Sequence, residues 1–448
     1  MRECIRIQSS KRAQSREQIQ HGKQIQHGKQ IQHGKRMGKR FGRRLFGALM
    51  LLVVGAMLTS CGGEEEVVPK AKTRLVLWHY WDIPAMRQKL TQLADEYNAS
   101  QDEVIIDPEY VPDEDFRKTL ALASEDGKVP DLILADCSDI RYFERMSPLV
   151  DLSEVIDWDE YLDQAVELCE AEDGTMIGFP LGLNCLTLYY NKGILQRSGV
   201  KPPETFEEFL SAAKTMTSGQ IYGCGFAGLI SEETTYSFLP IIWGFGADMK
   251  NLNTPEGEQA YQFLRELVQS GAVSRSTANM TMSDVARQFS KGNIAMIFAA
   301  SGKMEYYFKQ NPQLRYGQIR IPGATDRTSV IGGEVLLVPD QKNREKAVDF
   351  VRFLSQPEQM KSYLESAGYL APRRDVLEWQ MEKNPERRKD LYGLKHARIR
   401  ERVEYWPAIS IALAETVNQT ILQKEPQDSW KKLADRIAQI REEYHEGE

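Results

Sequence analysis

The chain has 448 residues, of which 42% are hydrophobic and 27% are charged, a composition typical of globular proteins. That length exceeds what one hydrophobic core normally serves and predicts two or three domains. Residues 1–60 hold 13 of the 57 Lys and Arg but only two of the 64 Asp and Glu, so residues 61–448 carry a formal net charge of −18. A body this negative repels phosphate backbones and anionic lipid, which argues against nucleic-acid binding and against membrane attachment through its surface.

The extreme N-terminus is predicted to lie outside the globular body. Residues 18–35 are three copies of Gln-Ile-Gln-His-Gly-Lys, a repeat with too few apolar side chains to bury a core. Residues 1–36 are therefore expected to be a disordered extension, and the alternative is that translation starts at Met37.

Residues 37–60 have the pattern of an export signal. A basic segment precedes an apolar stretch from Leu45 to Leu58, which is shorter than the roughly 20 residues of a membrane span. The motif Leu58-Thr59-Ser60-Cys61 resembles the bacterial lipoprotein signal, and this resemblance implies lipid attachment at Cys61. Residues 61–72 lack an apolar period and are expected to be a tether.

The body begins with alternating strands and helices. Residues 74–78 are a short apolar run typical of a buried strand, and an apolar stripe after Pro84 predicts a helix. Further strands are predicted at 104–106 and 129–134, with a helix between them. This alternation predicts a parallel sheet.

Polar and aromatic side chains follow two of these strands. Ligands of open α/β sheets bind beyond the carboxyl ends of the strands, so we expect a ligand near Trp78, Tyr80, Trp81 and Asp82. Asp136 follows the third strand, where its carboxylate either accepts hydrogen bonds from a hydroxylated ligand or caps the next helix.

The stretch 178–192 is expected to carry the chain from one lobe to another. Gly178, Pro180 and Gly182 interrupt regular structure, and alternating apolar and polar residues then predict a strand. Asn184 lies at this passage, where its amide can bond a ligand. The alternative is an ordinary junction between a loop and a strand.

Three later turns supply the remaining candidate site residues. Trp243 lies in a Gly-rich aromatic turn that lacks the Lys-Ser/Thr ending of a phosphate loop. Ser301 follows the predicted strand 294–298, and Gly333 and Glu334 precede another strand. Helices are predicted to start near Thr205, Thr254, Asn343 and Pro357, and around Trp430.

The sequence offers little for other chemistry. From residue 61 onward the histidines are scattered and no Cys-x-x-Cys pair occurs, so no metal site is expected. No nucleophile elbow or readable catalytic triad appears. Cys137, Cys169, Cys185 and Cys224 allow three full disulfide pairings, and buried free thiols are the alternative.

The order of motifs makes the chain similar to the extracellular solute-binding proteins of sugar ABC transporters, the family that includes maltose-binding protein. The resemblance extends from Thr73 to the C-terminus. Its motifs are 78–81, 130–132, 180–192, 203–208, 289–296 and 332–333.

The resemblance implies a two-lobe α/β fold of the periplasmic-binding-protein type II class. Each lobe would have a central β-sheet flanked by helices, and crossover hinge segments would join the lobes. Lobe 1 is then expected to comprise residues 73–182 and 321–372, and lobe 2 residues 183–320 and 373–448.

The resemblance also implies roles for the candidate residues. The aromatic residues would stack on sugar rings, and these are Trp78, Tyr80, Trp81 and Trp243. The polar residues would bond sugar hydroxyls, and these are Asp82, Asp136, Asn184 and Glu334. Two further residues, Ser301 and Gly333, would line the cleft. Many relatives carry a stacking Trp shortly after the position of Met296, but this chain has Ser301-Gly302 in that region.

The implied function is capture of a mono- or oligosaccharide and its delivery to ABC permease subunits. We expect a monomer without catalytic residues or cofactor, anchored by lipid on the extracytoplasmic side of a bacterial cell envelope. A secreted glycoside hydrolase with two carboxylates, or an adhesive surface lipoprotein, are the alternatives.

Overall fold

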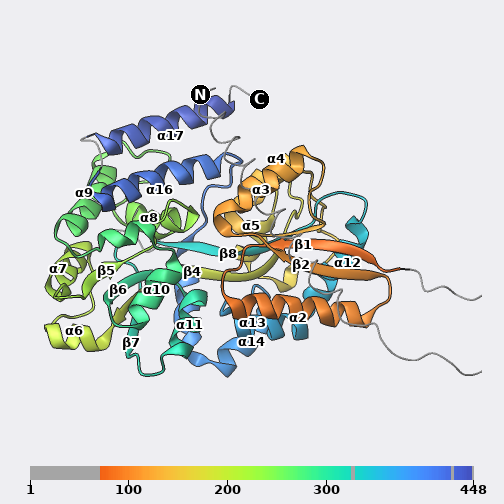
Figure 1. Ribbon diagram of the computed structural model, residues 1–448, viewed down its shortest axis with the longest axis horizontal. Coiled ribbons are helices and arrows are strands. Elements are labelled where there is room, and N and C mark those ends of the chain that lie inside the picture. Colours follow the sequence, from red (N-terminus) through yellow and green to blue (C-terminus); the bar gives the residue numbers. More distant parts are fainter. Residues whose placement is uncertain (1–70, 324–327, 425–427, 446–448) are drawn as a thin grey trace, which may run out of the picture. The chain divides into compact units, whose positions relative to one another are not determined.

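The computed structural model describes residues 71–323, 328–424 and 428–445. The hexapeptide repeat, the signal-like segment, Cys61 and most of the expected tether lie outside the described residues. Within those residues the chain forms a mixed α/β fold in which helices flank β-strands, as the sequence predicts (Figure 1).

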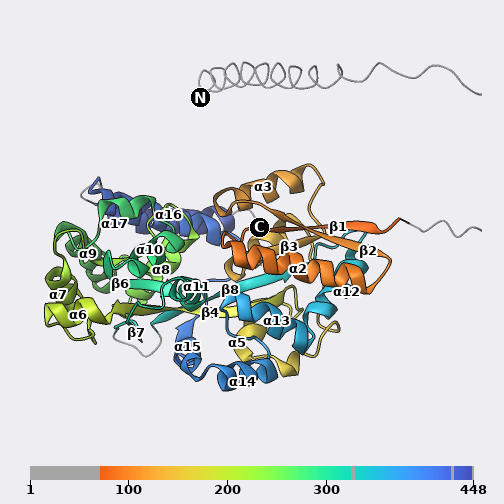
Figure 2. The ribbon, with the colours of Figure 1, turned by 60° about the horizontal axis from the view of Figure 1, so that its bottom comes forward.

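The first lobe is built on a parallel group of strands. Strand β1 (Thr73–His79) lies between β2 (Val104–Tyr110) and β3 (Leu132–Asp136). Its helices are α2 (Pro84–Ser100), α3 (Asp113–Glu125), α4 (Ile140–Met146), α5 (Asp163–Cys169), α12 (Arg344–Leu354), α13 (Pro357–Ala367), α14 (Arg374–Lys383) and α15 (Arg388–Lys395). Helix α2 begins at a proline and buries one apolar stripe, and α13 packs against it (Figure 2).

The second lobe is formed by the middle of the chain and its C-terminus. Strand β6 (Ile294–Ala300) pairs in parallel with β5 (Tyr222–Gly225), and β7 (Tyr316–Ile319) is a further strand of this lobe. Its helices are α6 (Lys192–Ser198), α7 (Phe206–Met216), α8 (Glu232–Gly244), α9 (Pro255–Gln269), α10 (Met282–Ser290), α11 (Ser301–Gln310), α16 (Trp406–Leu422) and α17 (Ser429–His445). Thr281 caps α10 through a reciprocal pair of hydrogen bonds with Asp284.

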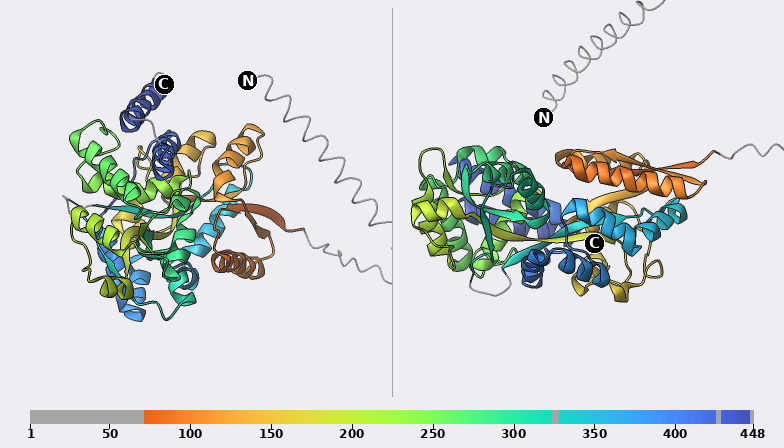
Figure 3. Two further views of the ribbon diagram at one scale, coloured as in Figure 1. Left: turned by 60° about the vertical axis from the view of Figure 1, so that its left-hand side comes forward. Right: turned by 90° about the horizontal axis from the view of Figure 1, so that it is seen from below.

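Two long antiparallel strands connect the lobes. These are β4 (Phe179–Asn191) and β8 (Ser329–Leu337), which run between the lobes in Figures 1 and 3. Up to Cys185, β4 pairs with β8, and from Leu186 it pairs with β6 and β7. The hydrophobic cores change at the same place, because Cys185 packs in the first core and Leu186 in the second.

The lobe boundaries differ from those expected. The core of the first lobe extends to Cys185 rather than to residue 182, and Ile321 and Val330 pack in the second core although they were expected in the first. The largest difference is at 374–397, expected in lobe 2, because α14 and α15 pack on the first core through Val376, Met381 and Leu394. The apolar stripe of an amphipathic helix predicts which face of the helix is buried, but it does not predict which of the two cores that face packs against.

The cysteines of the described segments are all free thiols. Cys137, Cys169, Cys185 and Cys224 are buried, which settles the alternative left open by the sequence. Burial raises the pKa of each thiol above its ordinary value. These side chains therefore behave as small apolar groups of the two cores.

Candidate ligand-binding site

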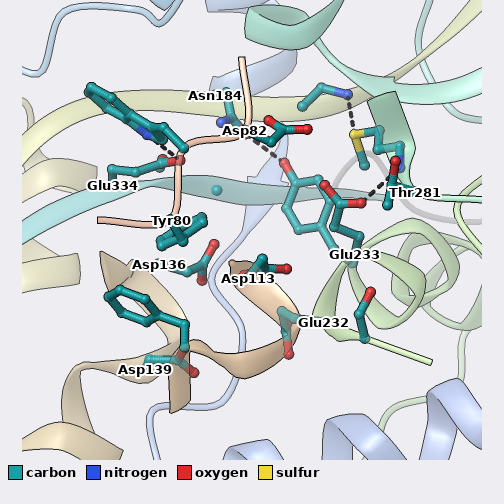
Figure 4. A pocket seen from close by; sticks show the side chains of 18 of the residues that line it. Tyr80, Asp82, Asp113, Asp136, Asp139, Asn184, Glu232, Glu233, Thr281 and Glu334 are labelled. Atoms are coloured by element: carbon teal, nitrogen blue, oxygen red, sulfur yellow. Dashed lines mark hydrogen bonds between the residues drawn. The ribbon is translucent and has the colours of Figure 1, made fainter. Parts of the chain in front are cut away.

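A cavity of about 160 Å³ lies between the lobes, beside the crossing of β4 and β8 (Figure 4). The first lobe contributes the ends of β1 and β3 and the start of α3, and the second contributes the starts of α8 and α10. The side chain of Asp82 accepts a hydrogen bond of 2.8 Å from the hydroxyl of Ser283, so the lobes touch at this cavity.

Seven of the candidate residues are brought together here. Tyr80, Trp81 and Asp82 follow β1, Asp136 ends β3, and Asn184, Gly333 and Glu334 come from the crossing strands. These seven residues, all named as candidates from the sequence, therefore line one side of the cavity.

Two aromatic side chains hold the carboxylate of Glu334. Its Oε1 accepts hydrogen bonds from the indole N–H of Trp81 at 3.3 Å and from the hydroxyl of Tyr369 at 2.7 Å. Burial and the charge of Glu334 raise the pKa of Tyr369 well above its ordinary value, so the phenol keeps the proton that it donates. The carboxylate is thereby held in one orientation at the floor of the cavity.

Asn184 is held from the opposite lobe. Its Oδ1 accepts a hydrogen bond of 2.8 Å from the hydroxyl of Tyr236, which lies on α8. The neighbouring position on β8 is Gly332, where a Cβ atom would lie 2.6 Å from the same oxygen. The glycine thus leaves room for a polar contact that joins the crossing strand to the second lobe.

Arg400 connects both lobes through a buried ion network. The guanidinium is 3% exposed and lies 2.8 Å from Asp136 at the end of β3 and 2.8 Å from Glu232 at the start of α8. It also lies over the ring of Tyr236, 5.2 Å from the centroid. Glu232 accepts further hydrogen bonds from Trp406 and Ser410, so its buried charge is well satisfied.

A second arginine bridges the lobes at the edge of the cavity. Arg117 on α3 binds Asp139 at 2.8 Å and approaches Glu232 at 3.5 Å. Burial raises the pKa of Asp139 to about 6, although the Arg117 charge opposes the shift. Asp136 and Asp139 are therefore both paired with arginines of the cavity wall, Asp136 with Arg400 and Asp139 with Arg117.

Three predicted site residues lie elsewhere, which corrects the sequence analysis. Trp78 points to the other face of β1 from His79, because side chains alternate along a strand, and its indole N–H bonds Glu109 at 3.1 Å. Trp243 is not in a turn but near the end of α8, under the guanidinium of Arg398 at 4.4 Å.

The position of Trp243 follows from helix geometry. It lies seven residues after Tyr236, hence about 10 Å further along the axis and away from the cavity. Ser301 begins α11 and is 4% exposed, but it does not line the cavity. No ring supplied by Trp78 or Trp243 is therefore available to a ligand in this cavity.

Several lining residues were missed from the sequence. Tyr236, Glu232 and Glu233 share the first turns of α8 after Ser231, and this helix start was not among those expected. Tyr369 follows the end of α13, in a segment for which no site residue was expected. Arg400 has no local signal, because its partners lie far away in the chain.

Neither a metal-binding cluster nor a membrane-spanning helix is found among the described residues. No group of three or more His, Cys, Asp or Glu side chains is arranged to hold a metal ion within the described ranges. None of the helices described has both the length and the apolar character needed to cross a membrane.

Comparisons with known proteins agree with this architecture. A family profile described as bacterial extracellular solute-binding protein matches residues 92–389. A binding protein of Brucella abortus is 26% identical over 210 residues, which are 44% of this chain, and the chain spans about half (51%) of that relative's length.

Two further proteins extend the likeness. The sn-glycerol-3-phosphate-binding periplasmic protein of Brucella abortus is 27% identical over 349 residues, 71% of this chain and 78% of the relative. The structure of an ABC transporter solute-binding protein from Thermotoga lettingae, bound with alpha-D-tagatose, matches with a TM-score of 0.75 at 21% identity, over 82% of this chain and all of that one. The similarity to the Thermotoga lettingae structure is a similarity of fold.

Proposed function

Because the chain belongs to the family of bacterial extracellular solute-binding proteins, we propose that it captures a small carbohydrate between its lobes and delivers it to the permease of an ABC transporter. Its matched relatives are binding proteins and not enzymes. The proposal is carried by the convergence of aromatic rings and fixed hydrogen-bonding groups from both lobes on one cavity.

The chemistry of the cavity suits a sugar. Aromatic faces such as those of Tyr80 and Trp81 pack against the C–H faces of a pyranose, and fixed polar groups such as Asn184 and Glu334 bond its hydroxyls. The relatives and neighbours carry names that mention tagatose and glycerol phosphate, both small hydroxylated solutes.

The size of the cavity favours a single sugar unit. One water needs about 10–15 Å³ of such volume, so about 160 Å³ has room for on the order of ten waters. That space suits a monosaccharide or a polyol. A dissociation constant of about 1 μM, or roughly −8 kcal/mol, is enough for capture and still allows release.

We extend the proposal to the attachment of the protein. Lipid at Cys61 would hold a monomer at the extracytoplasmic face of a membrane, where its permease lies. The support is the lipoprotein-like motif together with membership of an extracellular family. Mass spectrometry of the membrane-bound protein tests this part, because an unmodified Cys61 in the mature chain contradicts it.

The binding function is tested with two matched tryptophan variants. Titration calorimetry of the full chain against monosaccharides, disaccharides, polyols and glycerol 3-phosphate identifies the ligand. Trp81→Phe removes an indole N–H inside the cavity, and Trp78→Phe removes one outside it. We expect Trp81→Phe to weaken binding roughly tenfold, through the lost support of Glu334, and Trp78→Phe to leave it unchanged.

The outcomes separate the alternatives. Saturable binding of an intact sugar supports the proposal, and ligand at 100 times its dissociation constant should add about 2.7 kcal/mol of stability. Hydrolysed products in the mixture would indicate a glycosidase. Binding of glycerol 3-phosphate without any sugar would show that the carbohydrate assignment is wrong.

A further inference from the structure

The ring of Tyr369 lies between two stretches of backbone that carry no side chain. A Cβ atom at Gly182 on β4 would lie 2.6 Å from the Cβ of Tyr369, and one at Gly302 on α11 would lie 3.0 Å from its ring carbon Cε1. Carbon atoms pack best at about 3.5–4.0 Å, so a side chain at either position would push on the tyrosine. The tyrosine fits here because both neighbours are glycines.

These two glycines belong to different lobes. Tyr369 packs in the first core, as does β4 up to Cys185, whereas α11 is a helix of the second lobe. Beside the ring the lobes also meet through their backbones, since a Cβ atom at Gly368, at the end of α13, would lie 2.8 Å from the carbonyl oxygen of Gly302. Gly302 is thus a point of direct contact between the lobes.

The backbone that carries Tyr369 is held by hydrogen bonds within the first lobe. The side-chain amide of Gln380 on α14 donates to the carbonyl oxygen of Tyr369 at 3.0 Å, and its oxygen accepts from the backbone N–H of Ala371 at 2.8 Å. Leu370 exchanges two backbone hydrogen bonds with Leu183 of β4. The segment cannot shift away from α11 without breaking these bonds.

An arginine links α11 to the same place. Arg387, just before α15, donates from Nη2 to the carbonyl oxygen of Gly368 at 2.6 Å and from Nη1 to the carboxylate of Glu305 on α11 at 3.1 Å. The first of these partners lies in the first lobe and the second in the second lobe. Because both the segment of Tyr369 and α11 are held, a side chain at position 302 would act mainly on the ring.

The far end of the ring holds a carboxylate of the cavity. The hydroxyl of Tyr369 donates a 2.7 Å hydrogen bond to Oε1 of Glu334, and both residues line the cavity whereas Gly302 does not. The ring is rigid, and Cε1 is bonded to the carbon that carries the hydroxyl, so a push on Cε1 moves the hydroxyl. Residue 302 is therefore connected to Glu334 through one aromatic side chain.

We propose that Gly302 is a positioning residue of the binding site, because the absence of a side chain there lets Tyr369 hold Glu334 in the orientation that a ligand meets. The inference rests on the proposed function and deepens it by naming a residue that sets affinity from outside the cavity. It also gives the glycine a role that its own helix does not require, since alanine is the better helix former.

Two matched glycine variants test this role. Gly302 and Gly193 are each the second residue of a helix of the second lobe, α11 and α6. A Cβ atom at Gly193 would meet only side-chain atoms of its own segment, Asn191 Oδ1 at 3.3 Å and Arg197 Nη1 at 3.4 Å. Titration calorimetry of the full chain against D-tagatose, D-glucose, maltose and sorbitol selects a probe that binds the wild type. We expect Gly302→Ala to weaken binding of that probe roughly tenfold and Gly193→Ala to leave it unchanged, with similar melting of the two ligand-free variants.

A double-mutant cycle tests the route through the tyrosine. Tyr369→Phe keeps the ring and removes the hydroxyl that bonds Glu334. Tyr363→Phe is its control, since that hydroxyl has no hydrogen-bond partner among the described residues and does not line the cavity. Gly302→Ala should weaken binding no more than about twofold in the Tyr369→Phe background but still roughly tenfold in the Tyr363→Phe background.

The possible failures are distinguishable. Unchanged affinity in Gly302→Ala overturns the inference and leaves the binding function standing. A fall in the melting temperature of the ligand-free protein that Gly193→Ala does not share also overturns it, because the glycine would then serve the fold. Equal losses in the two tyrosine backgrounds overturn the route through Tyr369. A wild type that binds none of these probes and nothing in the wider panel overturns the proposed function, and the inference with it.

Discussion

His79 is a buried histidine next to the cavity wall. It is 3% exposed, its ring lies 6.5 Å from that of Trp81 and 5.7 Å from that of Tyr110, and its Nδ1 has no hydrogen-bond partner among the described residues. Burial, with a smaller contribution from the charge of Arg87, lowers its pKa from the ordinary value of 6.5 to about 4. The folded protein therefore holds this imidazole neutral.

This shift predicts a pH-dependent stability. Between about pH 4 and 6.5 the unfolded chain binds a proton at His79 that the folded chain does not, so stability falls as the pH is lowered through that window. His79→Phe keeps an aromatic ring and removes the titration. We expect the loss of unfolding free energy between about pH 7 and 5 to be roughly 1–2 kcal/mol smaller in the variant, as measured by urea denaturation.

The control for this variant is another histidine. His396→Phe removes an imidazole that lies beside Tyr392, away from the cavity. The stability of this variant should follow the wild-type pH profile more closely. If His79→Phe and wild type lose equal stability on acidification, the buried neutral state assigned to His79 is wrong.

The crossing strands depend on a close backbone approach at Gly333. This residue of β8 has φ of +152°, and a Cβ atom there would lie 2.2 Å from the carbonyl oxygen of Gly182 on β4. Only glycine allows the two strands to pair at this position, directly before the carboxylate of Glu334. The orientation of Glu334, which lines the cavity, is thus coupled to the packing of two strands.

Replacement of this glycine separates backbone strain from crowding. Gly127 has φ of +65° and would meet nothing within 4 Å as alanine, so Gly127→Ala should cost only about 1 kcal/mol. Gly333→Ala adds a backbone clash to strain and should cost about 3 kcal/mol or more. Chemical denaturation of both variants measures the two losses of unfolding free energy. Similar losses would show that β4 and β8 can move apart at Gly333 without destabilising the protein.

Secondary structure was predictable where apolar periodicity is clear. The strand expected at 74–78 is observed as β1, and the stripe after Pro84 is α2. The crossing point in β4 was less predictable, because this strand is buried along almost its whole length and no change of pattern marks Leu186. A strand that is buried in both cores has one continuous run of buried residues, so its sequence pattern does not mark the boundary between the cores.

At the scale of the whole molecule, the predictable part of the site was the part encoded by neighbours in sequence. Tyr80, Trp81 and Asp82 were found because they follow a recognisable strand. Arg400 and Glu232 were not, because the ion pair joins residues 168 positions apart and each is an unremarkable charge in its own segment. Pairing of buried charges is decided by the assembled fold, which local pattern does not describe.

The contact between Asp82 and Ser283 gives the last prediction, because it joins the two lobes directly. Asp82 follows β1 in the first lobe, and Ser283 lies in the first turn of α10 in the second, with their oxygens 2.8 Å apart. If ligand drives the lobes together, a bond that exists only in the closed arrangement adds to ligand affinity. A hydrogen bond to a charged group is worth roughly 1.5–3 kcal/mol, and part of this is regained from water when the lobes open.

Ser283→Ala should therefore weaken ligand binding roughly five- to tenfold and speed ligand release, with little effect on the unfolding of the ligand-free protein. Ser290→Ala is the matched control, since the Ser290 hydroxyl bonds the backbone oxygen of Tyr307 within the second lobe, at 3.4 Å. Calorimetry and stopped-flow release measure affinity and rate, and small-angle scattering reports whether ligand still compacts the variant. Unchanged affinity in Ser283→Ala would mean that closure depends on the ligand and the buried arginine network alone, without this contact between the lobes.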